Sequence, residues 1–212
     1  LKKDVRAIIT THYKESLSLV TKEEKRDHAL KVVEALAAKK YGAAAYDEEY
    51  GGTNSFYNYF SIFEILCEYN LNYAIKFGVQ FGLFGGAISS LGTKFHHDKY
   101  LKAIGEAKLL GCFAMTETGH GSNVKDLETM ATYNHASKEL TIHSPGFNSG
   151  KEYIGNALHG RLAVVFCQLM VDNINHGIHA VVVPYRDDAG NLLNGIRVED
   201  CGYKMGLNGI DN

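Results

Sequence analysis

The hydrophobic pattern of this chain changes its period once, close to Leu109, and that change constrains the fold more than any other feature. Before it, apolar residues recur three and four positions apart, as along one face of a helix. After it, short runs rich in β-branched residues alternate with clusters of Asn, Gly, Ser and Asp, which is typical of strands and turns. Helices followed by strands, rather than alternating with them, indicate an α+β protein.

The helical half contains four segments with this spacing, and we expect four or five helices to pack as a bundle. Thr21 is a predicted N-cap for the first of these segments. The segments are 22–40, 55–70, 72–92 and 94–108.

The second half contains six predicted strands, which favours an antiparallel sheet or barrel. The strands are 109–117, 127–134, 138–144, 161–171, 177–184 and 195–200. We therefore predict an N-terminal α-helical domain over 1–110 and a middle, β-barrel-like domain over 111–212.

Composition excludes several classes of protein. The chain has 212 residues, 45 % of them hydrophobic, and a formal net charge of −2, so it lacks the basic excess of nucleic-acid-binding domains. The apolar stretch around Phe77 to Leu91 is broken by glycines and is shorter than the ~18 to 20 residues that span a bilayer. Four cysteines occur without a CxxC pair, which indicates free thiols rather than a zinc site or disulfides. The chain begins without methionine, and we expect it to be a segment of a longer protein.

The sequence TETGHGS, from Thr116 to Ser122, is unusual for a linking loop because two glycines flank His120. Glu117 and His120 have the ExxH spacing of a metal site, but the glycines disfavour a helix and no second copy exists, so no metal is expected. A hydrolase built from Ser122, His120 and Glu117 lacks a recognisable strand-to-helix elbow.

A different interpretation is that this loop presents hydroxyls and backbone N–H groups to the polar rim of a flat heterocycle or to a pyrophosphate. The segment GKEYIGN, from Gly150 to Asn156, adds Tyr153, whose ring can stack on a planar group. Two ordinary β-hairpin loops remain the alternative.

Together these segments resemble the acyl-CoA dehydrogenase and acyl-CoA oxidase superfamily of flavoproteins. The stretches that carry the resemblance are DEEYGG (47–52), GCFAMTETGHGSNVKDLETMATY (111–133), GKEYIGNA (150–157) and GYKMGLNGIDN (202–212). The long second stretch looks like the flavin signature of the family and is far more specific than a lone glycine motif. The likeness covers essentially the whole chain, and the C-terminal helical domain of the family is absent from it.

The resemblance implies FAD as cofactor and gives specific contacts to three of these residues. Thr116 would hydrogen-bond the pyrimidine side of the flavin, and Ser122 would lie near the flavin pyrophosphate or the acyl-CoA substrate. Tyr153 stands where many members have a tryptophan against the ring. The full set of implied flavin contacts is Phe113, Met115, Thr116, Gly121, Ser122, Tyr153 and Gly155.

Gly155 favours the oxidase branch of the family. Typical dehydrogenases carry a threonine there, whose hydroxyl reaches flavin N5, whereas oxidases tend to have glycine together with GHG in place of GAG. Without the side chain, space beside N5 is expected to admit oxygen.

The implied reaction is FAD-dependent α,β-dehydrogenation of a fatty acyl-CoA to the trans-2-enoyl-CoA, with O2 as acceptor and H2O2 as product. The family's base is a glutamate that would lie beyond Asn212, so no catalytic residue is expected in this chain, and neither Glu117 nor Glu128 is a candidate. The alternatives are a dehydrogenase that passes electrons to an electron-transfer flavoprotein, and a catalytically inactive scaffold or binding protein. We expect the full-length protein to be a homodimer or higher homo-oligomer, cytoplasmic if bacterial and peroxisomal if eukaryotic.

Overall fold

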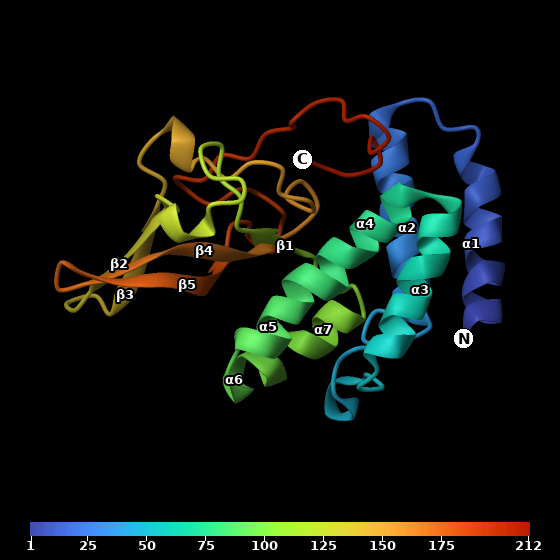
Figure 1. Cartoon of the computed structure of the whole chain (residues 1–212), viewed down its shortest axis with the longest axis horizontal. Helices are drawn as coiled ribbons and strands as arrows, with labels where there is room; N and C mark the ends of the chain where they lie inside the picture. The colour runs from blue at the N-terminus through green and yellow to red at the C-terminus, as the bar shows by residue number, and fades with distance from the viewer.

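Helices and strands occupy opposite halves of the molecule, in a computed structural model that describes residues 1–212 (Figure 1). The helical half comprises α1 (Lys2–Ser16), α2 (Lys22–Ala38), the 3-10 turn η1 (Glu48–Tyr50), α3 (Phe56–Tyr69), α4 (Leu71–Phe77), the π-helical η2 (Gly78–Phe84), α5 (Gly85–Leu91), α6 (Lys94–His96), the π-helical η3 (His97–Leu101) and α7 (Lys102–Gly105). The other half comprises β1 (Gly111–Ala114), the turn η4 (Val124–Asp126), β2 (Met130–Asn134), β3 (Glu139–His143), the turn η5 (Phe147–Ser149), β4 (Leu162–Val171) and β5 (Ile174–Pro184). The predicted α+β class is confirmed.

The start of α2 shows how local sequence sets a helix boundary. The Thr21 hydroxyl accepts from the Glu24 amide at 3.1 Å, and the Glu24 carboxylate accepts from the Thr21 amide at 2.9 Å. This capping box satisfies two N–H groups that a helix start leaves free, and it confirms the predicted N-cap.

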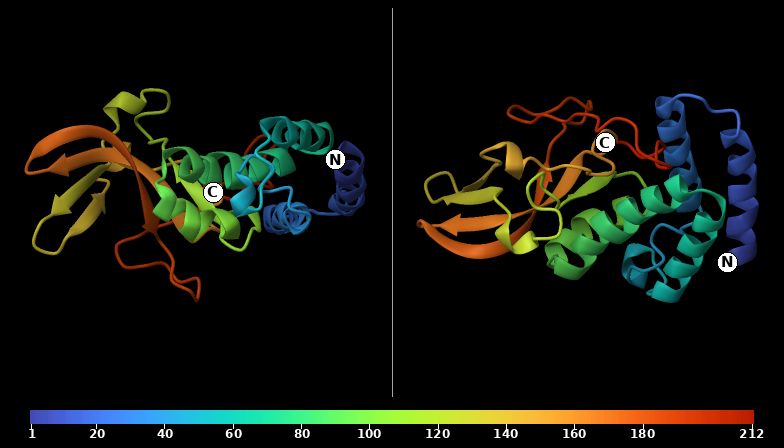
Figure 2. Two further views of the ribbon diagram at one scale, coloured as in Figure 1. Left: turned by 90° about the horizontal axis from the view of Figure 1, so that it is seen from below. Right: turned by 45° about the horizontal axis from the view of Figure 1, so that its top comes forward.

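The helix that runs unbroken from Leu71 to Leu91 through α4, η2 and α5 is the central element of the helical half (Figure 2). The helix is 21 residues long and, by length and composition alone, could cross a bilayer, whereas the apolar stretch was expected to fall short of a membrane span. Of its most apolar 18-residue window, 56 % is buried inside the protein. It buries Phe77, Phe81 and Phe84, which is typical of a core helix.

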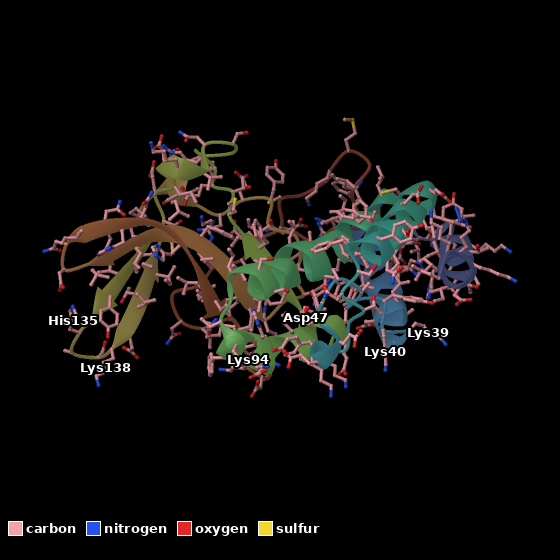
Figure 3. All side chains as sticks on the ribbon, turned by 60° about the horizontal axis from the view of Figure 1, so that its bottom comes forward. Lys39, Lys40, Asp47, Lys94, His135 and Lys138 are labelled. Atoms are coloured by element: carbon pink, nitrogen blue, oxygen red, sulfur yellow. The ribbon has the colours of Figure 1, made fainter.

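The sheet departs from the expected antiparallel barrel in three details. β4 pairs antiparallel with β5 along one edge, while β1 and β2 both pair parallel with its other edge, so the sheet is mixed. It is open rather than closed (Figure 2). The segment 195–200, predicted as a strand, forms none: Gly195 lies in a turn with φ of 80°, and residues 196–200 belong to no ladder. The β2–β3 turn, with His135 and Lys138, and the β4–β5 turn together form the end of the sheet away from the helices (Figure 3), where His135 hydrogen-bonds Asp172 at 2.8 Å.

The closing segment of the chain returns from the sheet to the helices (Figure 1). Asp200 pairs with Lys22 and Arg26 of α2, and the buried carboxylate of Asp211 pairs with the buried ammonium of Lys76 in α4. The Gly209 amide donates to the Asn72 side chain at 2.7 Å. These contacts tie the two halves together over a long separation in sequence.

The two halves also share one hydrophobic core. That core extends from the helices to Leu127, Val164 and Phe166 on the sheet side. The ring of Phe84 occupies the place where Gly111 would carry a side chain, so β1 lies directly against the central helix. All four cysteines are free thiols, as predicted.

Candidate functional site

The loop 115–129 exists because β1 and β2 lie end to end on one edge of β4. β1 pairs with β4 as far as Val165, and β2 resumes that edge at Gln168. The chain therefore leaves the sheet and returns close to its departure point, and it leaves part of the β4 edge without a strand partner. The carbonyl of Phe166 lies in this gap.

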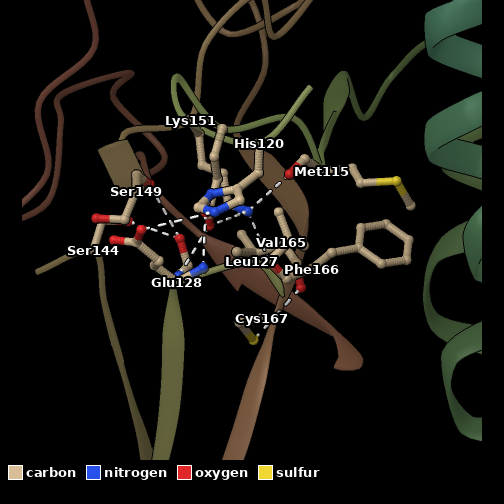
Figure 4. A network of polar contacts seen from close by, with 12 residues as sticks. Met115, His120, Leu127, Glu128, Ser144, Ser149, Lys151, Val165, Phe166 and Cys167 are labelled. Carbon is tan, nitrogen blue, oxygen red and sulfur yellow. Dashed lines mark hydrogen bonds and ion pairs between the residues drawn. The ribbon is translucent and has the colours of Figure 1, made fainter. Parts of the chain in front are cut away.

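Lys151 fills the gap (Figure 4). Its ammonium donates to the Phe166 carbonyl at 2.8 Å, to the Met115 carbonyl at 2.9 Å and to the Glu117 carboxylate at 3.1 Å. One side chain thus supplies the hydrogen-bond donor that the backbone of a continuous strand would have supplied to Phe166. Without it, a buried carbonyl would lack a donor, which costs free energy.

Glu117 holds the other side of the loop. Its carboxylate is fully buried and accepts from the amides of Glu128 at 2.8 Å and Thr129 at 2.9 Å, while His120 Nδ1 lies 3.2 Å away. Burial alone would raise the pKa of the Glu117 carboxyl, but these hydrogen bonds and Lys151 outweigh it and lower that pKa to about 2. Glu117 is therefore an ionised structural anchor of the loop.

Several polar groups of the loop have no partner within the chain. The hydroxyls of Thr116 and Ser122 take no part in the hydrogen bonds that hold the loop, unlike that of Thr118, which donates to the Gly150 carbonyl at 3.2 Å. The amides of residues 121–123 donate to no atom of the chain. A side chain at Gly121 would meet no protein atom within 4 Å. This donor set, with open space beside it, fits the polar rim and phosphates of a flat cofactor.

Tyr153 lies beside this donor set. The Glu152 amide donates to the Thr116 carbonyl at 3.2 Å, which brings the neighbouring Tyr153 next to the loop. Tyr153 has φ of 56° and is 66 % exposed. An aromatic ring held at positive φ and turned to solvent is available to stack on a planar group.

Phe113 and Met115 face the core more than the loop surface. Both are half-buried and pack against the main core, and the ring centroid of Phe113 lies 4.7 Å from that of Phe166. Their side chains therefore also support the sheet.

Gly155 has a packing partner that the sequence did not reveal. A Cβ at this position would lie 3.0 Å from Val79 Cγ2 and 3.7 Å from Ile210 Cγ2. The space beside Gly155 is thus partly filled by the central helix, so close packing disfavours a side chain at this position.

Val79 also lines a large apolar cavity between α3 and the central helix. The cavity has a volume of about 510 Å³, and ten of its 15 lining residues are hydrophobic, including Phe60, Phe63 and Leu83. Val79 therefore connects this cavity with Gly155. Within the stretch Tyr73 to Leu91, the positions from Ile75 onward supply much of the wall.

Two other types of site do not form at the loop. The Glu117 carboxylate is already paired with Lys151, and its ExxH segment is a tight turn rather than a helix. His120 directs Nδ1 to Glu117 and Nε2 toward Glu128, 3.8 Å away, so it does not pair with Ser122. Neither a carboxylate-bridged metal site nor a Ser–His–acid triad is present in this geometry.

Comparison with known proteins shows which family has this architecture. The model of the acyl-CoA dehydrogenase N-terminal domain matches residues 1–108, and that of the middle domain matches residues 112–212. The chain belongs to the acyl-CoA dehydrogenase family, and relatives with substantial identity are acyl-CoA oxidases. An acyl-coenzyme A oxidase-like protein of Mus musculus is 46 % identical over 149 residues, covering 70 % of this chain and 24 % of that protein. The peroxisomal acyl-coenzyme A oxidase 3 of Arabidopsis thaliana is 43 % identical over 153 residues, covering 72 % of this chain and 23 % of that protein.

Solved structures agree with this assignment. The crystal structure of acyl-CoA oxidase 1 from Yarrowia lipolytica matches 99 % of this chain and 30 % of its own, with a TM-score of 0.82 and 27 % identity. Acyl-CoA oxidase 2 of Caenorhabditis elegans, solved with FAD, ascaroside-CoA and ATP, matches 99 % of this chain and 32 % of its own, with a TM-score of 0.77 and 26 % identity. The chain spans about a quarter of the length of the relatives described above.

Proposed function

We propose that this chain is part of an acyl-CoA oxidase that converts a fatty acyl-CoA to the trans-2-enoyl-CoA and passes the electrons to O2, giving H2O2. The observation that carries the proposal is the junction at Val79, where an apolar cavity suited to an acyl chain meets the segment proposed to contact the flavin. FAD, when bound, would accept the hydride from the β-carbon. The oxidase names of the relatives support O2 as acceptor.

In this proposal the residues of the chain bind and orient. The Thr116 hydroxyl hydrogen-bonds the edge of the flavin ring, and Tyr153 stacks on that ring. The hydroxyl of Ser122 and the amides of residues 121–123 hydrogen-bond a pyrophosphate or the CoA. Phe113, Met115, Gly121 and Gly155 complete the contact surface. Lys151 and Glu117 hold the loop that carries these groups.

The chain provides no catalytic base in this proposal. A glutamate beyond Asn212 is expected to remove the α-proton. Glu117 is unsuited to that role, because its donors stabilise the ionised form and lower its pKa to about 2, which makes it a weak base. We infer that the isolated chain binds flavin weakly and turns nothing over, so stoichiometric flavin retained by the isolated chain would refute this inference.

The test uses the full-length protein with its flavin, mixed with a saturated long-chain acyl-CoA with and without air. Bleaching of the flavin without air, followed by recovery in air with one H2O2 per enoyl-CoA, supports the oxidase. Bleaching that persists in air until an electron-transfer flavoprotein is added identifies a dehydrogenase. Absence of any bleaching favours a non-catalytic binding protein.

We further propose that the full-length protein forms a homodimer or larger homo-oligomer. Several relatives are named peroxisomal, which supports a peroxisomal location if the source is eukaryotic. A bacterial source would place it in the cytoplasm.

A further inference from the structure

The hydroxyls of two tyrosines pack against glycines of the helix that lines the apolar cavity. Only one of the two hydroxyls has a hydrogen-bond partner within the chain. The Tyr46 hydroxyl lies over Gly85 and donates to the Phe81 carbonyl at 2.9 Å. The Tyr59 hydroxyl lies over Gly82, one turn earlier. It makes no hydrogen bond within the chain, and burial raises the pKa of Tyr59 to about 12, so its phenol stays neutral.

The Tyr59 ring is held in one place. Its centroid lies 5.4 Å from that of Phe60, 6.4 Å from that of Phe63 and 5.4 Å from that of Phe77. The residue is 8 % exposed and lines the cavity. A hydroxyl at the end of a clamped ring cannot turn away to find another partner, so its partner has to come from the contents of the cavity.

A polar group in apolar surroundings costs free energy unless it is hydrogen-bonded. Water can serve the Tyr59 hydroxyl while the cavity is empty. An unsubstituted hydrocarbon chain would displace that water and supply no partner, whereas an oxygen on the chain would restore the hydrogen bond. The same asymmetry lets sites built around a hydroxyl discriminate against analogues that lack one.

We propose that Tyr59 makes this cavity selective for acyl groups that carry an oxygen substituent part-way along the chain, as in a hydroxyacyl-CoA. The inference rests on the proposed function, because it takes the cavity to be the acyl site. Gly82 follows Val79 by three positions, at most about 4.5 Å along the helix. The hydrogen bond would therefore form inside the cavity, one step farther along it than the end that meets Gly155. It would lie away from the carbons that react.

The test measures binding to the full-length holoprotein, reduced with dithionite so that no turnover occurs. Calorimetry compares dodecanoyl-CoA with derivatives that each carry one hydroxyl, placed from mid-chain to the terminal carbon. We expect at least one derivative to bind about 10-fold more tightly than dodecanoyl-CoA, the factor that corresponds to about 1.4 kcal/mol. Tyr59→Phe should abolish this preference, and Tyr46→Phe should keep it, because that hydroxyl is already bonded to Phe81.

Each outcome decides one claim. If dodecanoyl-CoA binds the unmodified protein as tightly as every hydroxy derivative does, or if Tyr59→Phe keeps the preference, the role of Tyr59 is refuted while the acyl-CoA proposal stands. If no acyl-CoA binds a folded, flavin-loaded protein, the proposed function itself fails. The comparison on the unmodified protein remains decisive even if a variant does not fold.

Discussion

Replacing Glu117 by glutamine tests whether this carboxylate anchors the loop. Glu117→Gln keeps the shape of the side chain but removes its charge and turns one acceptor into an NH2 donor. The acceptor positions face two amides and the Lys151 ammonium, so the new NH2 group would oppose an N–H donor. Lys151 would also lose its only carboxylate partner.

The size of the effect follows from these contacts. Breaking a buried ion pair by removing one partner costs about 3–5 kcal/mol. Lys151 keeps the carbonyls of Met115 and Phe166 as acceptors and retains some exposure, so we expect the lower end, about 3 kcal/mol. For a chain of this length, that corresponds to a fall in melting temperature of roughly 6 to 12 °C.

The stabilisation by Glu117 should also depend on pH, in a direction that its lowered pKa sets. The pKa of Glu117 is lower in the folded state than its usual value of 4.5, so its contribution to stability is complete above that value and is lost as the pH falls toward about 2. Urea unfolding should therefore show the full difference in free energy of unfolding between the unmodified protein and Glu117→Gln near neutral pH. The gap should narrow once the pH drops below about 4.5.

Glu128→Gln is the matched control. Its side chain is 44 % exposed and its contribution to the loop comes from the backbone amide, so this variant should change stability by less than about 0.5 kcal/mol. Equal stability of Glu117→Gln and the unmodified protein near neutral pH would refute the anchoring role. A gap that does not change between neutral and acid pH would show that packing, and not charge, is responsible.

Two further substitutions test long-range contacts by urea unfolding. Gly155→Thr should destabilise the protein by about 1–3 kcal/mol, because the new Cβ would meet Val79. Adding Val79→Ala should recover much of this lost stability. If it does not, packing against Val79 does not explain this glycine. Lys76→Met should cost about 3–5 kcal/mol by leaving the Asp211 carboxylate buried without its cation. Adding Asp211→Asn should then restore part of that stability, and a double variant no better than Lys76→Met would contradict the assignment.

Features that depend on residues close in sequence were open to prediction from the sequence. The change of period near Leu109 indicated helices followed by strands, and Thr21 marked the start of α2 because a cap bonds to an amide only three residues away. The unusual composition of the loop 116–122 identified it as a candidate binding segment. Its family signature could be recognised without any knowledge of how the strands pair.

Features that join distant segments were decided only by the tertiary structure. The role of Lys151 depends on β1 and β2 sharing one edge of β4, and no spacing in the sequence encodes that gap. The contact of Val79 with Gly155, and the partner-free hydroxyl of Tyr59, depend on where the central helix lies. Caps and periodicity act within one or two turns of chain, whereas strand partners, ion pairs and cavities follow from which surfaces meet after the chain has folded.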